Sequence, residues 1–244
     1  MKLQVIGCGD AFGTAGRFNT CFRIEAGHGA ALIDCGASSL IAMRRLGVEP
    51  NGIGHVFLTH LHGDHFAGLP FFILDAQLYS RRRDPLVVVG PPGTEERLRQ
   101  AMEVLFPGSS RVERRFSIEV REIDAGAAHE IGGWRVWAFP AKHPSGAPSY
   151  SLRLEADGRS LAYTGDTEWT GALPELARDL DLLIAETLFF ERKVPFHLDY
   201  ATLREHLPEL GARRLLLTHL GPEMFERLGD VEHPVAEDGL TLDI

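Results

Sequence analysis

Five short apolar runs in this chain each end at a residue that can bind a metal ion or transfer a proton. Gly, Pro or polar residues bound each run, as expected for buried strands. The runs end at His60, His143, Asp166, Glu186 and His219. Because a rigid sheet can bring the ends of several strands together, the pattern predicts a β-rich fold with one site assembled from distant residues.

The first of these runs continues into a dense group of potential ligands. His60, His62, Asp64 and His65 lie within six residues. Four desolvated polar groups so close together would be costly unless a cation paired with them. His60 and His62 can converge on one metal ion, and Asp64 with His65 can converge on a second. Asp166 follows a glycine at a strand end and is suited to bridge the two ions.

His143 and His219 would complete the two sites. Imidazole and carboxylate together suit zinc, and manganese or iron fits the same geometry. Hydroxide attack near neutral pH needs a cation that lowers the pKa of bound water, and a second cation can hold the leaving oxygen. The sequence therefore predicts a metal-dependent hydrolase with two divalent ions, for which zinc is the first choice.

Composition and charge limit the domain organisation, the binding partners and the location that we expect for this protein. The 244 residues are 44% apolar and 24% charged, as in ordinary globular proteins. No linker divides the chain, so we expect a single domain over residues 1–244. The net charge of −9 argues against an extended DNA-binding face. No apolar signal or membrane-spanning run is present, which makes a cytoplasmic protein without membrane contact the expectation. Cys8, Cys21 and Cys35 are expected to be small buried hydrophobes.

The apolar pattern also predicts the elements. Residues 57–61 resemble residues 216–220, which suggests two similar β-rich halves packed sheet on sheet with helices outside. Strands are expected at 3–7, 20–25, 30–34, 86–90, in a run ending at His60, and over much of 117–165, with helices near 38–46, 66–80, 94–105, 172–178 and 199–208.

Taken together, these motifs resemble the metallo-β-lactamase superfamily. The segment His60-Leu61-His62-Gly63-Asp64-His65 matches its HxHxDH signature, and Thr59 with residues 67–70 matches the branch of tRNase Z and related phosphodiesterases. The resemblance continues in the family's order at residues 32–36, at His143 with 148–150, at 163–167 and at 217–219. It implies an α/β (α+β) fold, the four-layer αβ/βα sandwich of two mixed sheets packed face to face.

The resemblance also implies roles for individual residues. One metal would be held by His60, His62 and His143 and the other by Asp64, His65 and His219, with Asp166 bridging. Glu186 and His197 occupy the places of a pair near the leaving group. A histidine held by a carboxylate is a reasonable general acid, so Asp64, His197 and Glu186 are the expected catalytic residues. Asp34 would support a ligand histidine.

Three features depart from tRNase Z. Its long arm, which grips tRNA, lies in the bacterial form between the third histidine motif and the Thr-Gly-Asp motif. Here residues 151–160 fill that interval and read as a hairpin. Residues 7–13 and 17–22 look like a branch of small, uncharacterised hydrolases, and the chain is acidic. These departures weaken the case for pre-tRNA cleavage and leave the metal chemistry intact.

The leading hypothesis is a dinuclear phosphodiesterase acting on a small nucleotide or short RNA-end phosphodiester. Three alternatives stay open: a tRNase Z-type pre-tRNA 3′ endonuclease, an ester, thioester or lactone hydrolase, and a non-enzymatic metal-binding scaffold. The helix expected from Phe66 to Tyr79 is apolar on most faces, so a homodimer contact and burial under the protein's own loops are both consistent with it.

Overall fold

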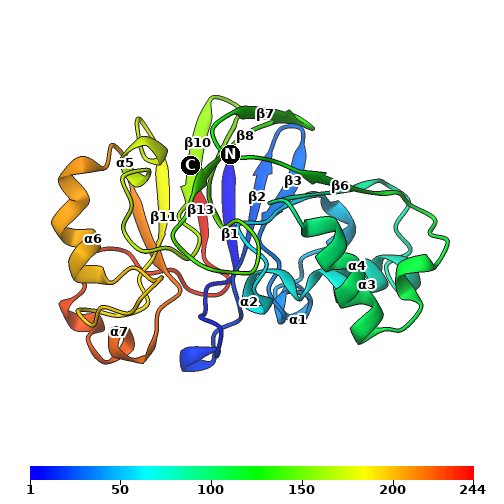
Figure 1. The fold of residues 1–244 in the computed structure, drawn as a ribbon, viewed down its shortest axis with the longest axis horizontal. Helices are drawn as coiled ribbons and strands as arrows, with labels where there is room; N and C mark the ends of the chain where they lie inside the picture. The colour runs from blue at the N-terminus through cyan, green and yellow to red at the C-terminus, as the bar shows by residue number, and fades with distance from the viewer.

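The structure is a computed structural model that describes residues 1–244. Two mixed β-sheets, one of seven strands and one of six, pack face to face. Helices α1–α4 flank the first sheet and α5–α7 flank the second (Figure 1). This is the four-layer arrangement that the sequence predicts.

The first sheet is built mainly from the N-terminal half of the chain. Strands β3, β4, β5 and β6 are parallel to one another, whereas β1 pairs with β2 and β13, and β2 with β3, in antiparallel fashion. Across the sheet the order is β13 (Thr241–Asp243), β1 (Lys2–Gly7), β2 (Cys21–Ala26), β3 (Gly29–Ile33), β4 (Ile53–Phe57), β5 (Leu86–Gly90) and β6 (Ile118–Glu122).

The second sheet has parallel strands at one side and antiparallel strands at the other. Strands β10, β11 and β12 are parallel, and β7 to β10 form an antiparallel meander. Its order is β12 (Leu215–Thr218), β11 (Leu182–Glu186), β10 (Arg159–Tyr163), β9 (Tyr150–Ala156), β8 (Trp134–Pro140) and β7 (Ala128–Ile131). Residues 151–160 form the β9–β10 hairpin, as predicted.

The helices are short. None of them has the length and apolar character needed to cross a bilayer. They are α1 (Ser39–Arg45), α2 (Gly63–Phe66), α3 (Leu69–Leu78), α4 (Thr94–Leu105), α5 (Leu173–Leu176), α6 (Tyr200–His206) and α7 (Pro222–Glu226), with 3₁₀ turns η1 (Thr14–Gly16), η2 (Pro50–Gly52), η3 (Ser109–Arg111), η4 (Leu207–Glu209) and η5 (Leu228–Asp230).

Three apolar clusters hold the layers together. One lies between the sheets, where the Phe22 ring contacts Tyr163 and the Phe57 ring contacts Trp134. A second joins the first sheet to α1, α3 and α4, and a third joins the second sheet to α5, α6 and α7. Burial of these side chains is the main stabilising contribution to the fold. All three cysteines are buried and free, as predicted.

The structure refines two predicted elements. The helix expected at 66–80 is two helices, α2 and α3, separated at Ala67 and Gly68. A Cβ on Gly68 would come within 2.2 Å of the Gly36 carbonyl oxygen, so the chain makes a backbone contact there that interrupts the helical pattern. The strand expected to reach His60 ends at Phe57, which leaves Leu58 to His62 as an extended loop.

Strand direction explains where the polar side chains gather. Because β10, β11 and β12 are parallel, their carboxyl ends share one edge of the second sheet. The end of β4 lies at the matching edge of the first sheet. There the His219 backbone N–H donates to the Cys8 carbonyl oxygen at 3.0 Å, and the Tyr150 N–H donates to the Thr59 carbonyl oxygen at 2.9 Å. These cross-sheet bonds join the two edges where the site forms.

Candidate metal centre

The seven residues predicted to be metal ligands come together at this seam. They fall into two groups, in each of which the ligand atoms lie within 4.8 Å of one another: His60, His62 and His143, and then Asp64, His65, Asp166 and His219. A third such group joins Asp166 and His219 to Glu186 and His197. The proximity that the sequence predicts is therefore present for all of them.

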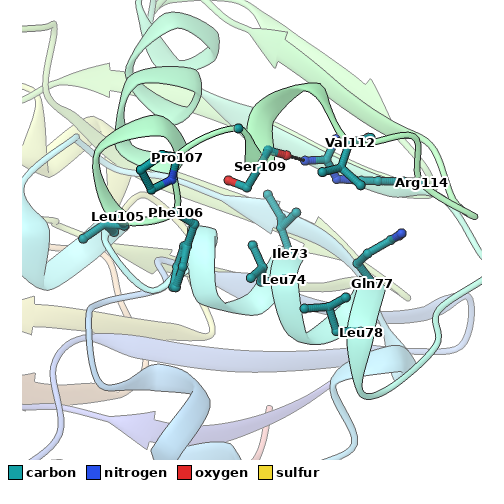
Figure 2. Close-up of a pocket in the computed structure, with 11 residues that line it drawn as sticks. Ile73, Leu74, Gln77, Leu78, Leu105, Phe106, Pro107, Ser109, Val112 and Arg114 are labelled. Atoms are coloured by element: carbon teal, nitrogen blue, oxygen red, sulfur yellow. Dashed lines mark hydrogen bonds between the residues drawn. The ribbon is translucent and has the colours of Figure 1, made fainter.

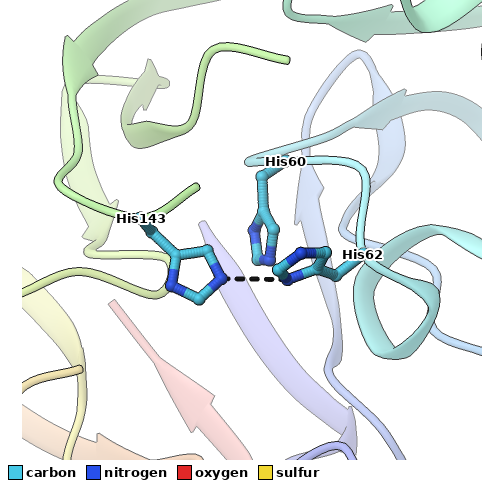
Figure 3. Close-up of side chains that lie close together, drawn as sticks. All are labelled: His60, His62 and His143. Carbon is cyan, nitrogen blue, oxygen red and sulfur yellow. Dashed lines mark hydrogen bonds between the residues drawn. The ribbon is translucent and has the colours of Figure 1, made fainter. Parts of the chain in front are cut away.

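The first group is a histidine triad (Figure 3). His143 Nε2 lies 2.9 Å from His62 Nδ1, and the His60 ring lies 5.0 Å from the His62 ring and 4.8 Å from the His143 ring, centroid to centroid. Burial is the main reason that the pKa of each of these imidazoles falls below its ordinary value. The neutral form, which is the form that ligates metals, is therefore favoured.

The second group places two histidines between two carboxylates. His65 Nε2 is 3.3 Å from Asp64 Oδ2 and 3.3 Å from Asp166 Oδ1. His219 Nε2 is 3.3 Å and 3.5 Å from the same two oxygens. Burial alone would lower the pKa of His65, but the carboxylates of Asp166 and Asp64 raise it well above its ordinary value. With both imidazoles neutral, as metal ligation requires, the two carboxylates would leave a negative charge that a divalent cation would neutralise.

Asp166 faces both groups. Its Oδ1 points to the second group, and its Oδ2 lies 3.9 Å from His60 Nε2 and 3.8 Å from His143 Nε2. Gly165, which precedes it, has φ 59°, and a Cβ there would come within 2.7 Å of the Tyr150 carbonyl oxygen. The tight turn that delivers the carboxylate at the end of β10 therefore requires glycine.

Asp34 and Thr59 orient two of the histidines from behind. The Asp34 Oδ2 oxygen is 2.7 Å from His65 Nδ1 and accepts a bond of 2.8 Å from the Thr59 hydroxyl. The same hydroxyl lies 3.0 Å from His60 Nδ1. Such contacts select the tautomer and ring orientation of a ligand histidine. The support predicted for Asp34 is present, and Thr59 extends it to the first group.

Unpaired polar atoms indicate that this donor set suits a metal. Four buried ligand atoms have no hydrogen-bond partner: His60 Nε2, His65 Nε2, Asp166 Oδ1 and His219 Nδ1. Buried polar groups are nearly always satisfied, so a concentration of exceptions calls for an unseen partner. Three of these atoms face other predicted ligands, and the fourth, His219 Nδ1, lies 3.9 Å from Glu186 Oε2. Imidazole and carboxylate donors in this arrangement fit divalent metals such as zinc.

Glu186 and His197 form a pair beside the second group. The Glu186 Oε2 oxygen is 3.0 Å from His197 Nδ1, and the His197 imidazole approaches Asp166 Oδ2 to 4.0 Å. Glu186 is fully buried and also accepts a hydrogen bond from the Thr167 backbone N–H. Burial, followed by the charge of Asp166, raises the pKa of Glu186 well above its ordinary value. His197 retains partial exposure, so it can meet a substrate.

Two residues of the site were missed by the sequence reasoning. The Phe196 carbonyl oxygen accepts a 2.9 Å bond from His143 Nδ1, and the Phe196 backbone N–H donates a 2.9 Å bond to Glu168 Oε1. Glu168 also pairs with Lys142 at 2.6 Å. Backbone contacts carry no side-chain signature, so only the adjacency of Phe196 to His197 and of Lys142 to His143 could have drawn notice.

The remaining features lie apart from the centre. His28, His55, His129, His206 and His233 belong to none of the ligand groups. An apolar groove of about 460 Å³ lies between α3 and residues 105–114, lined by side chains such as Leu74, Leu78 and Val112 (Figure 2). None of the predicted site residues lines this groove.

The comparisons with known proteins decide the family. A family model described as "Anti-Pycsar protein Apyc1" matches residues 1–233. The chain belongs to this Apyc1 family. It is 30% identical over 193 residues to ribonuclease Z of Mycobacterium bovis, covering 75% of this chain and 69% of that protein. It is 27% identical over 310 residues to ribonuclease Z of Haloferax volcanii, covering 100% and 95% of the two chains.

The solved structure of the metallo-β-lactamase fold protein YhfI from Bacillus subtilis superposes with a TM-score of 0.80 at 21% identity, over 99% of this chain and 98% of that one. The metallo-β-lactamase fold and the tRNase Z-like kinship predicted from the motifs are thus confirmed. The Apyc1-family chain is accordingly a hydrolase of this superfamily with a His/Asp metal site.

Proposed function

We propose that this protein is a phosphodiesterase with two divalent metal ions, and that it cleaves a small nucleotide phosphodiester such as a cyclic mononucleotide or a short RNA end. The observation that carries the proposal is the His197–Glu186 pair, 3.0 Å apart and adjoining the second ligand group. Phosphodiester cleavage expels an alkoxide, a poor leaving group that needs a proton, whereas many activated esters do not need one.

The chain's own residues have distinct roles in this proposal. His60, His62 and His143 would hold one ion and Asp64, His65 and His219 the other, with Asp166 reaching both. Bound metal would supply a nucleophile at neutral pH and stabilise charge on phosphorus. Asp34 and Thr59 orient the ligand imidazoles. Zinc is the proposed metal because nitrogen and carboxylate donors suit it.

His197 is the proposed general acid. Its Nδ1 faces Glu186, which leaves Nε2 free to donate a proton to the departing oxygen. Glu186 is held in turn by the Thr167 N–H, so the carboxyl group that orients His197 is itself fixed. General acids within reach of the leaving atom contribute on the order of 10²–10⁴ in rate.

Three observations favour a small substrate. The alignment with the Haloferax volcanii protein spans 310 positions, whereas this chain has 244 residues, so that relative contains segments that this chain lacks. Where the resemblance to bacterial tRNase Z would place the tRNA-gripping arm, this chain has only the β9–β10 hairpin. A net charge of −9 also disfavours a long polyanion.

A substrate panel tests the proposal. Zinc- or manganese-loaded protein is incubated with a 3′,5′-cyclic mononucleotide, bis-p-nitrophenyl phosphate, a pre-tRNA and a simple aryl ester. We expect hydrolysis of the first two at rates well above those for pre-tRNA and ester. Preferential cleavage of pre-tRNA would replace the proposal with the endonuclease alternative, and activity on the aryl ester alone would replace it with the carboxylic-ester alternative.

A further inference from the structure

One exposed segment beside the centre carries both positive charge and an aromatic ring. Residues 191–197 are part of the connection between β11 and α6, and Arg192, Lys193 and Phe196 are all exposed on it. The Arg192 guanidinium also lies 3.7 Å above the Phe189 ring. Glu191 in the same segment pairs with Arg227 at 3.2 Å, so Arg192 and Lys193 are the basic side chains that precede His197 in the sequence of a chain of net charge −9.

Phe196 has a backbone conformation that is unusual for its residue type. Its φ is 71°, in the left-handed region that bulky side chains rarely adopt. Such a conformation persists only where the surroundings hold it, and it is concentrated at functional sites. Here the N–H is held by Glu168 and the carbonyl oxygen by His143, each at 2.9 Å.

The Phe196 side chain is only partly buried. It is 41% exposed, although a phenylalanine is normally placed to bury its ring. The backbone of Phe196 is attached to a predicted ligand, His143, and is followed directly by the proposed acid, His197. An apolar ring is therefore kept in a strained position, in water, at the rim of the site.

We propose that Phe196 is a stacking platform for the nucleobase of the substrate, with Arg192 and Lys193 attracting its phosphate charge. Aromatic side chains beside basic groups bind single nucleotides in this way, and stacking tolerates any base because every base has a π-face. The inference rests on the proposed function and deepens it by assigning Phe196 as the residue that contacts the base.

Binding of two product-like probes tests the platform. The metal-loaded protein is titrated by calorimetry with a nucleoside 5′-monophosphate and with ribose 5-phosphate, which differ only in the base. We expect the wild type to bind the nucleotide more tightly. Phe196→Ala should weaken nucleotide binding by roughly tenfold to a hundredfold, the size of one stacked base, and leave ribose 5-phosphate within about twofold. Phe196→Tyr should retain the preference.

Two further variants separate stacking from folding. Phe196→Asn removes the ring but tolerates left-handed backbone, so it should bind like Phe196→Ala and unfold at no lower temperature than the wild type. Phe71→Ala is the matched control, because Phe71 is 40% exposed but stacks on Phe106 at 5.1 Å, away from the centre. It should leave both dissociation constants unchanged.

The outcomes distinguish this inference from the proposed function. Equal weakening of both probes in Phe196→Ala would mean that the residue only shapes the loop, and unchanged binding of both would also overturn the platform. A wild type that binds the two probes equally would overturn it while phosphodiester hydrolysis still stood. Conversely, a wild type that prefers the nucleotide but hydrolyses no phosphodiester would remove the proposed function and leave the stacking residue in place.

Discussion

Three of the five predicted ligand histidines have one ring nitrogen in contact with a residue outside the ligand set. His60 uses Nδ1 toward Thr59, and His65 uses Nδ1 toward Asp34. The partner of the His143 Nδ1 atom is the Phe196 carbonyl oxygen. In all three the Nε2 atom remains for the centre. The residues behind the predicted ligands thus determine which ring nitrogen is free to bind a metal. Such contacts fix the tautomer and the orientation of each imidazole.

The general-acid assignment predicts a dependence on the leaving group. His197→Ala should lower the rate on a nucleotide phosphodiester by about 10²–10⁴ and spare most activity on bis-p-nitrophenyl phosphate, because nitrophenolate leaves without a proton. Glu186→Gln should show the same pattern more mildly, since it only orients His197. Steady-state kinetics on the two substrates makes the comparison. Equal losses on both would instead assign His197 to metal binding or to structure.

Asp64 is the second residue-scale test. Its Oδ2 oxygen lies 3.3 Å from both His65 Nε2 and His219 Nε2, so Asp64→Ala removes one of the two carboxylates that these imidazoles face. We expect activity to be abolished and the metal content to fall by about one ion per chain. Elemental analysis and kinetics on the same preparation check both. A variant with near-wild-type rates would show that Asp64 is not a ligand.

At the scale of elements, the ends of the strands were predictable from the sequence, whereas the position of the 191–197 segment was not. Apolar runs marked the strands ending near His60, Asp166 and His219, because burial and sequence periodicity are directly linked. The HxHxDH motif indicated four predicted ligands because they lie within six residues of one another. The 191–197 segment has no periodicity, and its position depends on hydrogen bonds to Glu168 and His143 that arise only in the folded chain. The break at Gly68 has both a local and a distant signal: Pro70 lies in the first turn of α3, and the Gly68 N–H donates to the Cys35 carbonyl oxygen at 2.9 Å, a contact that arises only in the folded chain.

The contact of Glu168 with the 191–197 segment suggests that Glu168 positions His197. Its two carboxylate oxygens bond the Phe196 N–H and the Lys142 ammonium, so Glu168→Ala should release the loop that carries His197. We expect kcat on a nucleotide phosphodiester to fall by about tenfold or more, within the range that general-acid catalysis contributes, with little change on bis-p-nitrophenyl phosphate. Glu168→Gln should recover much of the rate, because its amide oxygen can still accept the N–H.

The control for Glu168 is Glu119→Ala. Glu119 pairs with Arg121 at 2.6 Å, the same length as the Lys142–Glu168 pair, but lies on β6. Its removal should change neither rate. A loss on both substrates in Glu168→Ala, or none on either, would contradict a positioning role that acts through His197.

At the scale of the whole molecule, the centre joins the two sheets. His60, His62, Asp64 and His65 follow β4 of the first sheet, and the other predicted ligands follow strands of the second. Bound ions should therefore stabilise the packing of one half on the other. Each ion at about 1,000 times its dissociation constant contributes about 4 kcal/mol to the free energy of unfolding. Two independent ions therefore correspond to roughly 16–32 °C in a chain of this size.

Elemental analysis should accordingly find two ions per chain, most of them zinc, after purification without chelators. Treatment with a chelator should lower the unfolding temperature by the amount above, and added Zn²⁺ should restore it. Protein that contains no metal, is not activated by Zn²⁺ or Mn²⁺ and does not change in thermal stability would contradict the metal assignment.

Homodimerisation also stays a prediction. The inner face of α3 is buried in the core, whereas Leu78 is 70% exposed and lines the apolar groove of Figure 2. If a second copy covers this groove, light scattering should give twice the chain mass of 26.9 kDa, and Leu78→Asp should give the monomer. Ile41→Asp, at a residue 62% exposed on α1, should remain dimeric. A wild type of monomer mass at micromolar concentration would rule the dimer out.

Because the predicted ligands are divided between the two sheets, they are also synthesised at different times. About 150 residues separate His65 from His219, and ribosomes add about 5–20 residues per second. A nascent chain would therefore carry its first four ligands for roughly 8–30 s before the last is made. During that interval a metal ion could contact only the predicted ligands that have already been made, before the second sheet is complete. All seven predicted ligands are present only after residue 219 has been made, so full coordination of both ions would be possible only in the nearly finished chain.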